Sequence, residues 1–307
     1  MSLSRSRVAV AAVMSSSLLA GLAVAESSGA TTPDTTLPST GEGPVGVIAI
    51  GHSGLTGENS DPAQPGQPAL ENSWATWTNP EVNSIYRRLV AARPENEGHV
   101  ANSAEGGAPA SRLAGQAESA MSTVPTPQLV IIQTIDGDLQ CPLDASALAA
   151  FGETLADVLD QIVTASPESR ILMVGQWGRP IAAGLEDFVA THPEVKPELT
   201  GTGEDCNGFF DPSGALVQET FDLLNASIDA YEGEQLRRCG AVPQCRTDGG
   251  VRAAHAPVEG EVSSDGDHLS VRGQASEAEL VWPVVVEMLG LDDAAASSAV
   301  STTELES

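Results

Sequence analysis

The sequence predicts an α/β fold: a single doubly wound, flavodoxin-like domain of three layers around a central parallel sheet of about five strands. Short apolar runs without polar alternation, such as residues 45–50 and 129–135, are typical of strands buried on both faces. Amphipathic segments separate these runs, so strands and helices alternate. Roughly 250 residues lie between an N-terminal lead-in and a short tail, which is enough for one core.

Five segments are expected to form the strands. Residues 129–135 give the strongest signal because they are rich in β-branched side chains. The other strands are predicted over residues 45–50, 99–103, 170–174 and 242–247. In a parallel doubly wound sheet, reactive residues gather at the carboxyl ends of the strands. Ser53, Gly107 and Gly137 each follow a predicted strand, so they are expected at that edge.

Five helices are expected from apolar residues that recur at spacings of three and four. They cover residues 82–92 and 111–121, a segment from an Asp144 N-cap to residue 163, residues 217–231, and a final segment that begins after a Ser270 N-cap. In the final helix, Pro283 is expected to kink or interrupt the backbone, and Gly290 to end it.

The start of the chain has the pattern of a secretory signal, which is removed on maturation. Arg5 and Arg7 precede a mostly apolar stretch over residues 8–24, and an Ala-Val-Ala cleavage site ends at Ala25. We therefore expect a secreted protein. Its expected parts are a signal peptide over 1–25, a flexible linker over 26–44, the α/β domain over 45–290 and a disordered tail over 291–307.

The composition is strongly acidic, with 42 Asp and Glu against 14 Lys and Arg and a net charge of −28. Such a surface repels nucleic acid and anionic membranes, so neither is expected as a partner. After the signal, no stretch of about 20 apolar residues occurs, so no stable membrane anchor is expected. The protein is expected to act as a monomer, and the acidity itself needs no explanation beyond solubility.

Four cysteines remain in a chain expected to enter an oxidising compartment, and their even number favours two disulfides. Three pairings are possible. Cys239–Cys245 is favoured because it closes a short local loop, which leaves Cys141 to pair with Cys206. Zinc is the competing explanation, but the chain has no C-x-x-C spacing. Neither a metal nor a cofactor is expected.

Ser53, Asp265 and His268 are the candidate catalytic residues. A serine hydroxyl is a poor nucleophile near neutral pH and needs a neutral imidazole to take its proton as it attacks a carbonyl. An aspartate three residues before the histidine can hold that imidazole in one tautomer. The order Ser, Asp, His is one of the orders known for hydrolase triads. Singly, Ser53 could be a turn residue, and the segment 265–268 could be a solvated loop that caps a helix.

Four blocks in order resemble the SGNH/GDSL hydrolase superfamily, and within it secreted bacterial esterases. They are Ile48–Thr56 around Gly51-His52-Ser53, Asn102–Ala108, Leu129–Cys141, and Asp265–Ser270 with Gly273-Gln274. The resemblance spans residues 45–289. It implies a Ser53–His268–Asp265 triad and an oxyanion hole that includes Ser53, Gly107 and Gly137.

The chain departs from the family pattern at three positions. His52 replaces the usual aspartate before the serine, and Gly54 stands before or in place of the usual leucine. The third block usually ends Gly-x-Asn-Asp, but here Gly137 stands where the asparagine is expected. Loss of one oxyanion donor typically costs about 10²–10³ in rate. A backbone N–H near Gly137 or a water is expected to fill the gap.

Three residues are predicted to contact substrate: His52, Asn102 and Trp177. For His52 and Asn102 a structural role is the alternative. The favoured function is a secreted serine esterase that cleaves carboxylic esters of lipids, short acyl chains or acetylated glycans. The second hypothesis is a catalytically weakened protein of the same fold that binds a cell-surface glycan. The third is an exported interaction protein with no active cleft.

Overall fold

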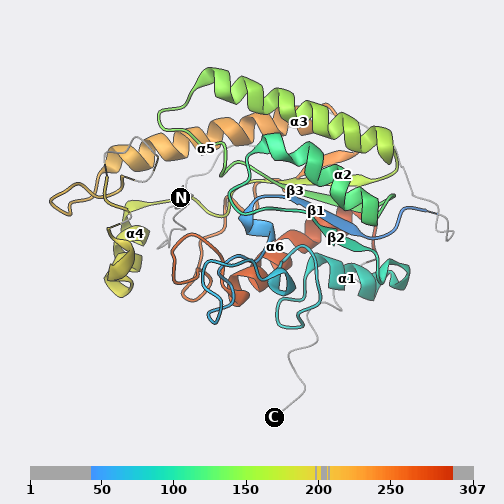
Figure 1. The fold of residues 1–307 in the computed structure, drawn as a ribbon, viewed down its shortest axis with the longest axis horizontal. Helices are drawn as coiled ribbons and strands as arrows, with labels where there is room; N and C mark the ends of the chain where they lie inside the picture. The colour runs from blue at the N-terminus through green and yellow to red at the C-terminus, as the bar shows by residue number, and fades with distance from the viewer. Residues whose placement is uncertain (1–42, 198, 202–205, 207, 293–307) are drawn as a thin grey trace, which may run out of the picture.

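Five parallel strands form the central sheet, in the order β2-β1-β3-β4-β5 (Figure 1). The structure is a computed structural model that describes residues 43–292 except 198, 202–205 and 207. The strands are β1 (Val47–Gly51), β2 (Val100–Asn102), β3 (Leu129–Gln133), β4 (Arg170–Val174) and β5 (Cys245–Thr247). This strand order is that of flavodoxin-like doubly wound folds, so the predicted fold class is confirmed.

Both faces of the sheet are buried, as the apolar runs in the sequence predict. Along β1, Ile48 and Ile50 belong to one core cluster, whereas Val47 and Ala49 belong to the other. Successive side chains of a strand point to opposite faces, so one apolar run supplies both cores. All five residues of β1 and all five of β3 are buried.

Helices cover the two faces in separate layers (Figure 1). On one face lie α2 (Leu113–Thr123), α3 (Ala145–Ala165) and α5 (Gln218–Cys239). On the other lie α1 (Ile85–Ala92) and α6 (Val271–Leu289). Asp144 caps α3 by accepting from the N–H groups of Ser146 and Ala147, and Ser270 caps α6. Both N-caps are therefore confirmed.

The structure differs from the sequence predictions in several places, including the following three. The last helix continues through Pro283 and ends, as predicted, at Gly290, whose φ is 56°. Strand β3 ends at Gln133 instead of residue 135, because Ile135 has a φ of 147° and leaves the extended conformation. Helix α4 (Ala182–Thr191) was not predicted, since it is short and contains Gly184.

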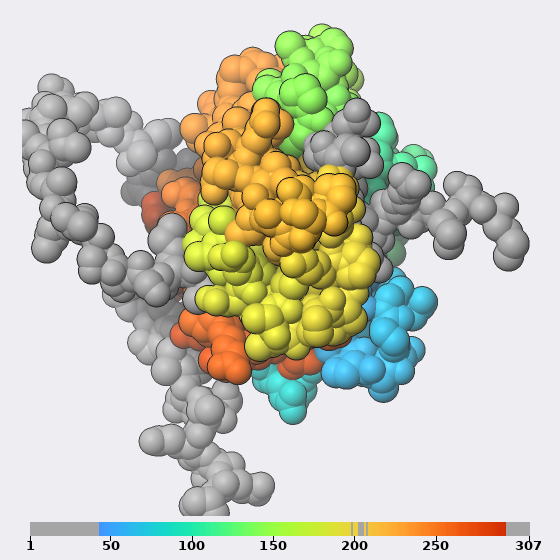
Figure 2. Space-filling model, turned by 90° about the vertical axis from the view of Figure 1, so that its left-hand side faces the viewer, coloured from blue at the N-terminus to red at the C-terminus, as the bar shows by residue number. Residues whose placement is uncertain are grey.

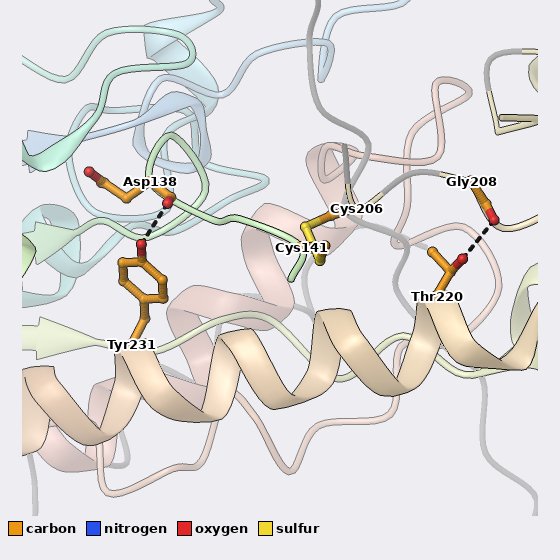
Figure 3. Close-up of a disulfide and its surroundings, with 6 residues drawn as sticks. All are labelled: Asp138, Cys141, Cys206, Gly208, Thr220 and Tyr231. Atoms are coloured by element: carbon orange, nitrogen blue, oxygen red, sulfur yellow. Dashed lines mark hydrogen bonds between the residues drawn. A yellow bond between two sulfur atoms is a disulfide. The ribbon is translucent and has the colours of Figure 1, made fainter. Parts of the chain in front are cut away.

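Two disulfides tie the helical layer to the sheet, in the pairing that the sequence favours. Cys141–Cys206 joins the loop after β3 to the segment that leads into α5, and Cys239–Cys245 joins the end of α5 to β5. Two side chains of α5 donate hydrogen bonds to the backbone near each cysteine of the first disulfide (Figure 3). The Tyr231 hydroxyl donates to the Asp138 carbonyl oxygen at 2.8 Å, and the Thr220 hydroxyl donates to the Gly208 carbonyl oxygen at 2.7 Å.

The carboxyl ends of the strands point to the left in Figure 1, toward α4 and the long loops. Figure 2 views that side, where the yellow α4 segment lies beside the orange-red loop of residues 250–270. A Cβ on Gly266 would stand 2.6 Å from the Phe188 ring, so this loop packs directly on α4. The predicted signal peptide, nearly all of the linker and most of the tail lie outside the described residues. Within the described part, no helix combines the length and apolar character needed to span a bilayer.

Candidate active site

A pocket at the carboxyl edge of the sheet brings together residues from both ends of the domain. Ser53 follows β1, Trp177 follows β4, and His268 lies in the loop before α6, and all three line the pocket. Its space is about 40 Å³, room for roughly three water molecules. Doubly wound folds bind their ligands at this edge of the sheet. The pocket is therefore the candidate active site.

The backbone that carries Ser53 turns sharply at the end of β1, and Gly51 makes the turn possible. Gly51 has a φ of 142°, and a Cβ here would stand 1.7 Å from the carbonyl oxygen of Gln133 on β3. The Gln116 side chain accepts from the Gly51 N–H at 2.7 Å and donates to its carbonyl oxygen at 3.0 Å. Ser53 then opens the 3₁₀ helix η1 (Ser53–Leu55). Only glycine fits this close approach, so the strand end fixes where the serine lies.

His268 and Asp265 form a hydrogen-bonded pair, with 2.7 Å between Nδ1 of the ring and Oδ2 of the carboxylate. This contact occupies Nδ1 and favours the tautomer in which Nε2 can accept a proton. Within the described part of the chain, Nε2 has no hydrogen-bond partner, and the Ser53 hydroxyl is not bonded to it. In serine hydrolases such a bond often tightens only when substrate binds.

Asp265 is held in place by a dense set of donors. Its Oδ1 accepts from the N–H groups of Asp267 and His268, each at 3.1 Å, and from the Ser263 hydroxyl. Its Oδ2 accepts from the side-chain amide of Asn59 as well as from the His268 ring. Burial alone would raise the pKa of this carboxyl, but the hydrogen bonds from His268 and Ser263 outweigh it and lower the pKa well below its usual value. Asp265 is therefore ionised at neutral pH.

Asn59 is a member of this network that sequence reasoning missed. Its φ of 58° is left-handed, a conformation that asparagine tolerates better than most residues. The backbone therefore turns the side chain back toward the loop that precedes α6. Its only signal in the sequence is a Gly57-Glu58-Asn59 turn, which does not indicate a contact with residue 265.

The charge around His268 favours its protonated form. Burial of the ring would lower its pKa, but the hydrogen bond to Asp265 and the negative charges of Asp267, Asp265 and Glu58 outweigh burial and raise the pKa to about 9. Asp267 contributes from 3.8 Å, measured from its Oδ2 to Nδ1 of the ring. The imidazole becomes a free base only as the pH approaches that value.

His52 lines the same pocket but is neutral. Its ring is 2% exposed, and burial lowers its pKa against the attraction of Asp136, while the positive charges of Arg252 and His268 lower it further. Nδ1 accepts from the Gly54 N–H at 3.2 Å and lies 3.3 Å from Oδ2 of Asp136. Nε2 is buried and has no hydrogen-bond partner among the described residues.

Asn102 and Gly107, both predicted site residues, do not line the pocket. The Asn102 amide donates to the Leu55 carbonyl oxygen at 2.8 Å and to the Thr76 hydroxyl at 2.9 Å, so it braces the segment that follows Ser53. Gly107 has a φ of 65°, and the space where its Cβ would stand is open.

Gly137 also stands away from the pocket, whereas its neighbour Asp136 lines it. A Cβ on Gly137 would stand 2.7 Å from the backbone of Ala108, so a side chain has no room at this position. Asp136 instead accepts from the Gln176 amide at 2.6 Å through its Oδ1. The conformation of Ile135 decides which side chain of this loop faces the pocket, and the sequence carries no signal for it.

A buried ion pair forms another part of the pocket wall. Arg252 and Glu277 are 1% and 0% exposed, with 2.6 Å between Nη2 and Oε1. Arg252 also donates to the Gly175 carbonyl oxygen, and its guanidinium lies 5.9 Å from the ring of Trp177. Burial raises the pKa of Glu277 to about 7, against the attraction of Arg252. Charged residues are mostly exposed, so composition alone does not predict this pair.

Among the described residues, no group of three or more His, Cys, Asp or Glu side chains is placed to hold a metal ion.

No protein-family model matches the chain, and no curated protein does. Solved structures with a similar fold include an extracellular lipase from Streptomyces rimosus, at 14% identity over 80% of this chain and 99% of that chain, with a TM-score of 0.44. A phospholipase A1 from Streptomyces albidoflavus is 15% identical over 80% of this chain and 99% of that chain, with a TM-score of 0.45. A carbohydrate esterase of family 2 from Corynascus thermopiles is 12% identical over 83% and 69%, with a TM-score of 0.46.

Proposed function

We propose that the protein is a secreted serine hydrolase of the SGNH type that cleaves carboxylic esters through Ser53, His268 and Asp265. The observation that carries the proposal is the 2.7 Å contact between Asp265 and His268, with His268 lining the same pocket as Ser53. The three residues come from opposite ends of the domain, and the fold gathers them at the edge where this architecture binds ligands. The two disulfides suit an oxidising compartment outside the cytoplasm.

The proposed reaction proceeds through an acyl-enzyme. Ser53 Oγ attacks the ester carbonyl carbon while Nε2 of His268 takes the hydroxyl proton, and the carbonyl π electrons move onto the oxygen. When this electron pair returns, the bond to the leaving oxygen breaks, and that oxygen takes the proton from His268. Water then attacks the acyl carbon with His268 again as base, and the acid and free Ser53 are released. Asp265 stabilises the imidazolium in both halves.

The experiment that tests this function needs no guess about the substrate. Intact mass is measured after exposure to a fluorophosphonate, with Ser53→Ala and His268→Ala as controls. One adduct on the wild-type chain, absent from both variants, is the expected result. A folded wild-type chain that forms no adduct would sink the esterase assignment.

A second candidate function is a weakened protein of this fold that binds a glycan. Two observations favour it: Ser53 and His268 share no hydrogen bond, and neither Gly107 nor Gly137 lines the pocket. It predicts an unreactive Ser53 in a folded protein, together with glycan binding that Ser53→Ala leaves unchanged.

A further inference from the structure

Two departures of this chain from the SGNH pattern bear on the proposed oxyanion hole. One is the missing asparagine donor of the third block, and the other is Gly54 directly after the proposed nucleophile. A Cβ on Gly54 would stand 2.2 Å from Nε2 of Gln133, the last residue of β3. The amide of Gln133 therefore occupies the space that any side chain at position 54 would need.

Gln133 is fixed by the sheet and by a neighbouring tryptophan. Its backbone pairs in register with Gly51, and its carbonyl oxygen accepts from the His52 N–H at 3.1 Å. The Trp74 indole N–H donates to Oε1 of its side chain at 3.3 Å. An indole N–H can only donate, so the oxygen of the amide faces Trp74 and the NH₂ group faces away from it.

The NH₂ group of Gln133 has no acceptor within the described part of the chain, although the residue is only 5% exposed and lines the pocket with Ser53. The nitrogen itself is open to the space of the pocket. The Ser53 backbone N–H likewise donates to no described residue. Two donors without acceptors thus flank the proposed nucleophile.

Several other polar side chains on this pocket are less suited to bind a negative oxygen. Asp136, when ionised, is an acceptor only, and the Gln176 amide already donates to it. Arg252 is engaged by Glu277 and by the Gly175 carbonyl oxygen. The ring proton of His52 lies on the unpaired Nε2 while Nδ1 accepts from the Gly54 N–H, but the Asp136 carboxylate 3.3 Å from Nδ1 competes for that proton.

We propose that Gln133 is a catalytic residue whose Nε2 amide, with the backbone N–H of Ser53, forms the oxyanion hole in place of the family's asparagine. The proposal rests on the proposed ester hydrolysis. As the Oγ–carbon bond forms, the carbonyl electrons move to the oxygen, and the two N–H donors stabilise the charge that develops there. Gly54 is glycine because this amide needs the space.

The first test compares Gln133→Met with the matched control Gln128→Met. Gln128 directly precedes β3 at the opposite edge of the sheet and is also 5% exposed. With p-nitrophenyl acetate as the probe, Gln133→Met is expected to lower kcat by about 10²–10³-fold with little change in KM, and Gln128→Met to change neither. Wild-type kcat in a folded Gln133→Met chain would overturn the proposal. Should methionine prevent folding, Gln133→Glu keeps the shape and replaces the donor by an acceptor, with the same expected loss.

The second test is a double-mutant cycle between positions 54 and 133. A methyl group in Gly54→Ala displaces the amide, so this variant should lose rate in the wild-type background and lose little more in the Gln133→Met background. Additive losses would show that the two positions act separately and would contradict the proposal.

Fluorophosphonate labelling separates this proposal from the one on which it rests. If the wild-type chain labels at Ser53 and Gln133→Met labels equally fast, the oxyanion role of Gln133 is wrong while the esterase assignment stands. If the wild-type chain does not label, both fail.

Discussion

His268 and His52 line one pocket, and each ring lies beside an aspartate, yet their pKa values move in opposite directions. The Nδ1–carboxylate distance is 2.7 Å for His268 and 3.3 Å for His52. Around His268, carboxylates outnumber cations and raise its pKa to about 9. Around His52, deeper burial dominates, and Arg252 and His268 add positive charge, so its pKa falls. An Asp–His contact therefore does not by itself make the histidine a general base, because burial and the other nearby charges decide whether the ring is protonated.

The largest expected effect comes from removing each ring in turn. His268→Ala should lower kcat for a short-chain ester by about 10⁴-fold or more, because the nucleophile loses its base. His52→Ala should lower kcat by about 10-fold or less, since its ring only lines the pocket and accepts from the Gly54 N–H as the N-cap of η1. Steady-state kinetics on folded variants measures both. Equal losses of kcat in the two variants would contradict the different roles assigned to the two histidines.

The Arg252–Glu277 pair gives a second comparison. Glu277 can lose its charge by taking up a proton, whereas Arg252 stays charged. Glu277→Leu leaves a buried guanidinium that cannot lose its proton, and it should cost about 3–5 kcal/mol of unfolding free energy. Arg252→Met should cost less, because the raised pKa of Glu277 lets that carboxyl take up a proton. Urea unfolding near pH 7 measures the two costs. A larger loss for Arg252→Met would contradict this assignment.

The smallest effect concerns the pH profile. The base must be neutral, so kcat/KM should rise with pH and level off only above a pKa of about 9. Asp267→Asn removes one of the charges that raise the pKa of His268, so the midpoint should move to lower pH. Asp136→Asn is the matched control, because Asp136 neighbours His52 and is not among the charges that raise the pKa of His268. A midpoint that moves with Asp136→Asn and not with Asp267→Asn would reverse the roles assigned to the two rings.

The elements that sequence predicts well are those with local signals. The buried runs of β1, β3 and β4 appear as apolar segments, and the caps at Asp144 and Ser270 follow from residue type and position. The contact between Asp265 and His268 could also be predicted from the sequence, because their three-residue spacing brings them together on one loop.

The residues that sequence did not predict depend on contacts between distant segments. Gln133 ends an apolar strand, and its significance comes from Trp74 on one side and Gly54 on the other. Arg252 carries a charge that is usually exposed, and it is buried only because Glu277 meets it. Asp136 faces the pocket because of the backbone conformation of Ile135, for which isoleucine gives no sign. These are properties of the packed chain, not of any short motif.

The register between β1 and β3 has a consequence for how this protein could change its substrate. Gly51 and Gln133 are paired across the sheet, so the spacing between the serine turn and the amide is set by the backbone ladder, at about 4.8 Å between strands. Substitutions in the loops after Leu55 and before Ser270, at positions other than Asn59, Asp265 and His268, can reshape the entrance without altering that spacing. The molecule thus sets the serine turn and the amide on its sheet, and specificity can evolve, or be engineered, at the remaining positions of the loops around them.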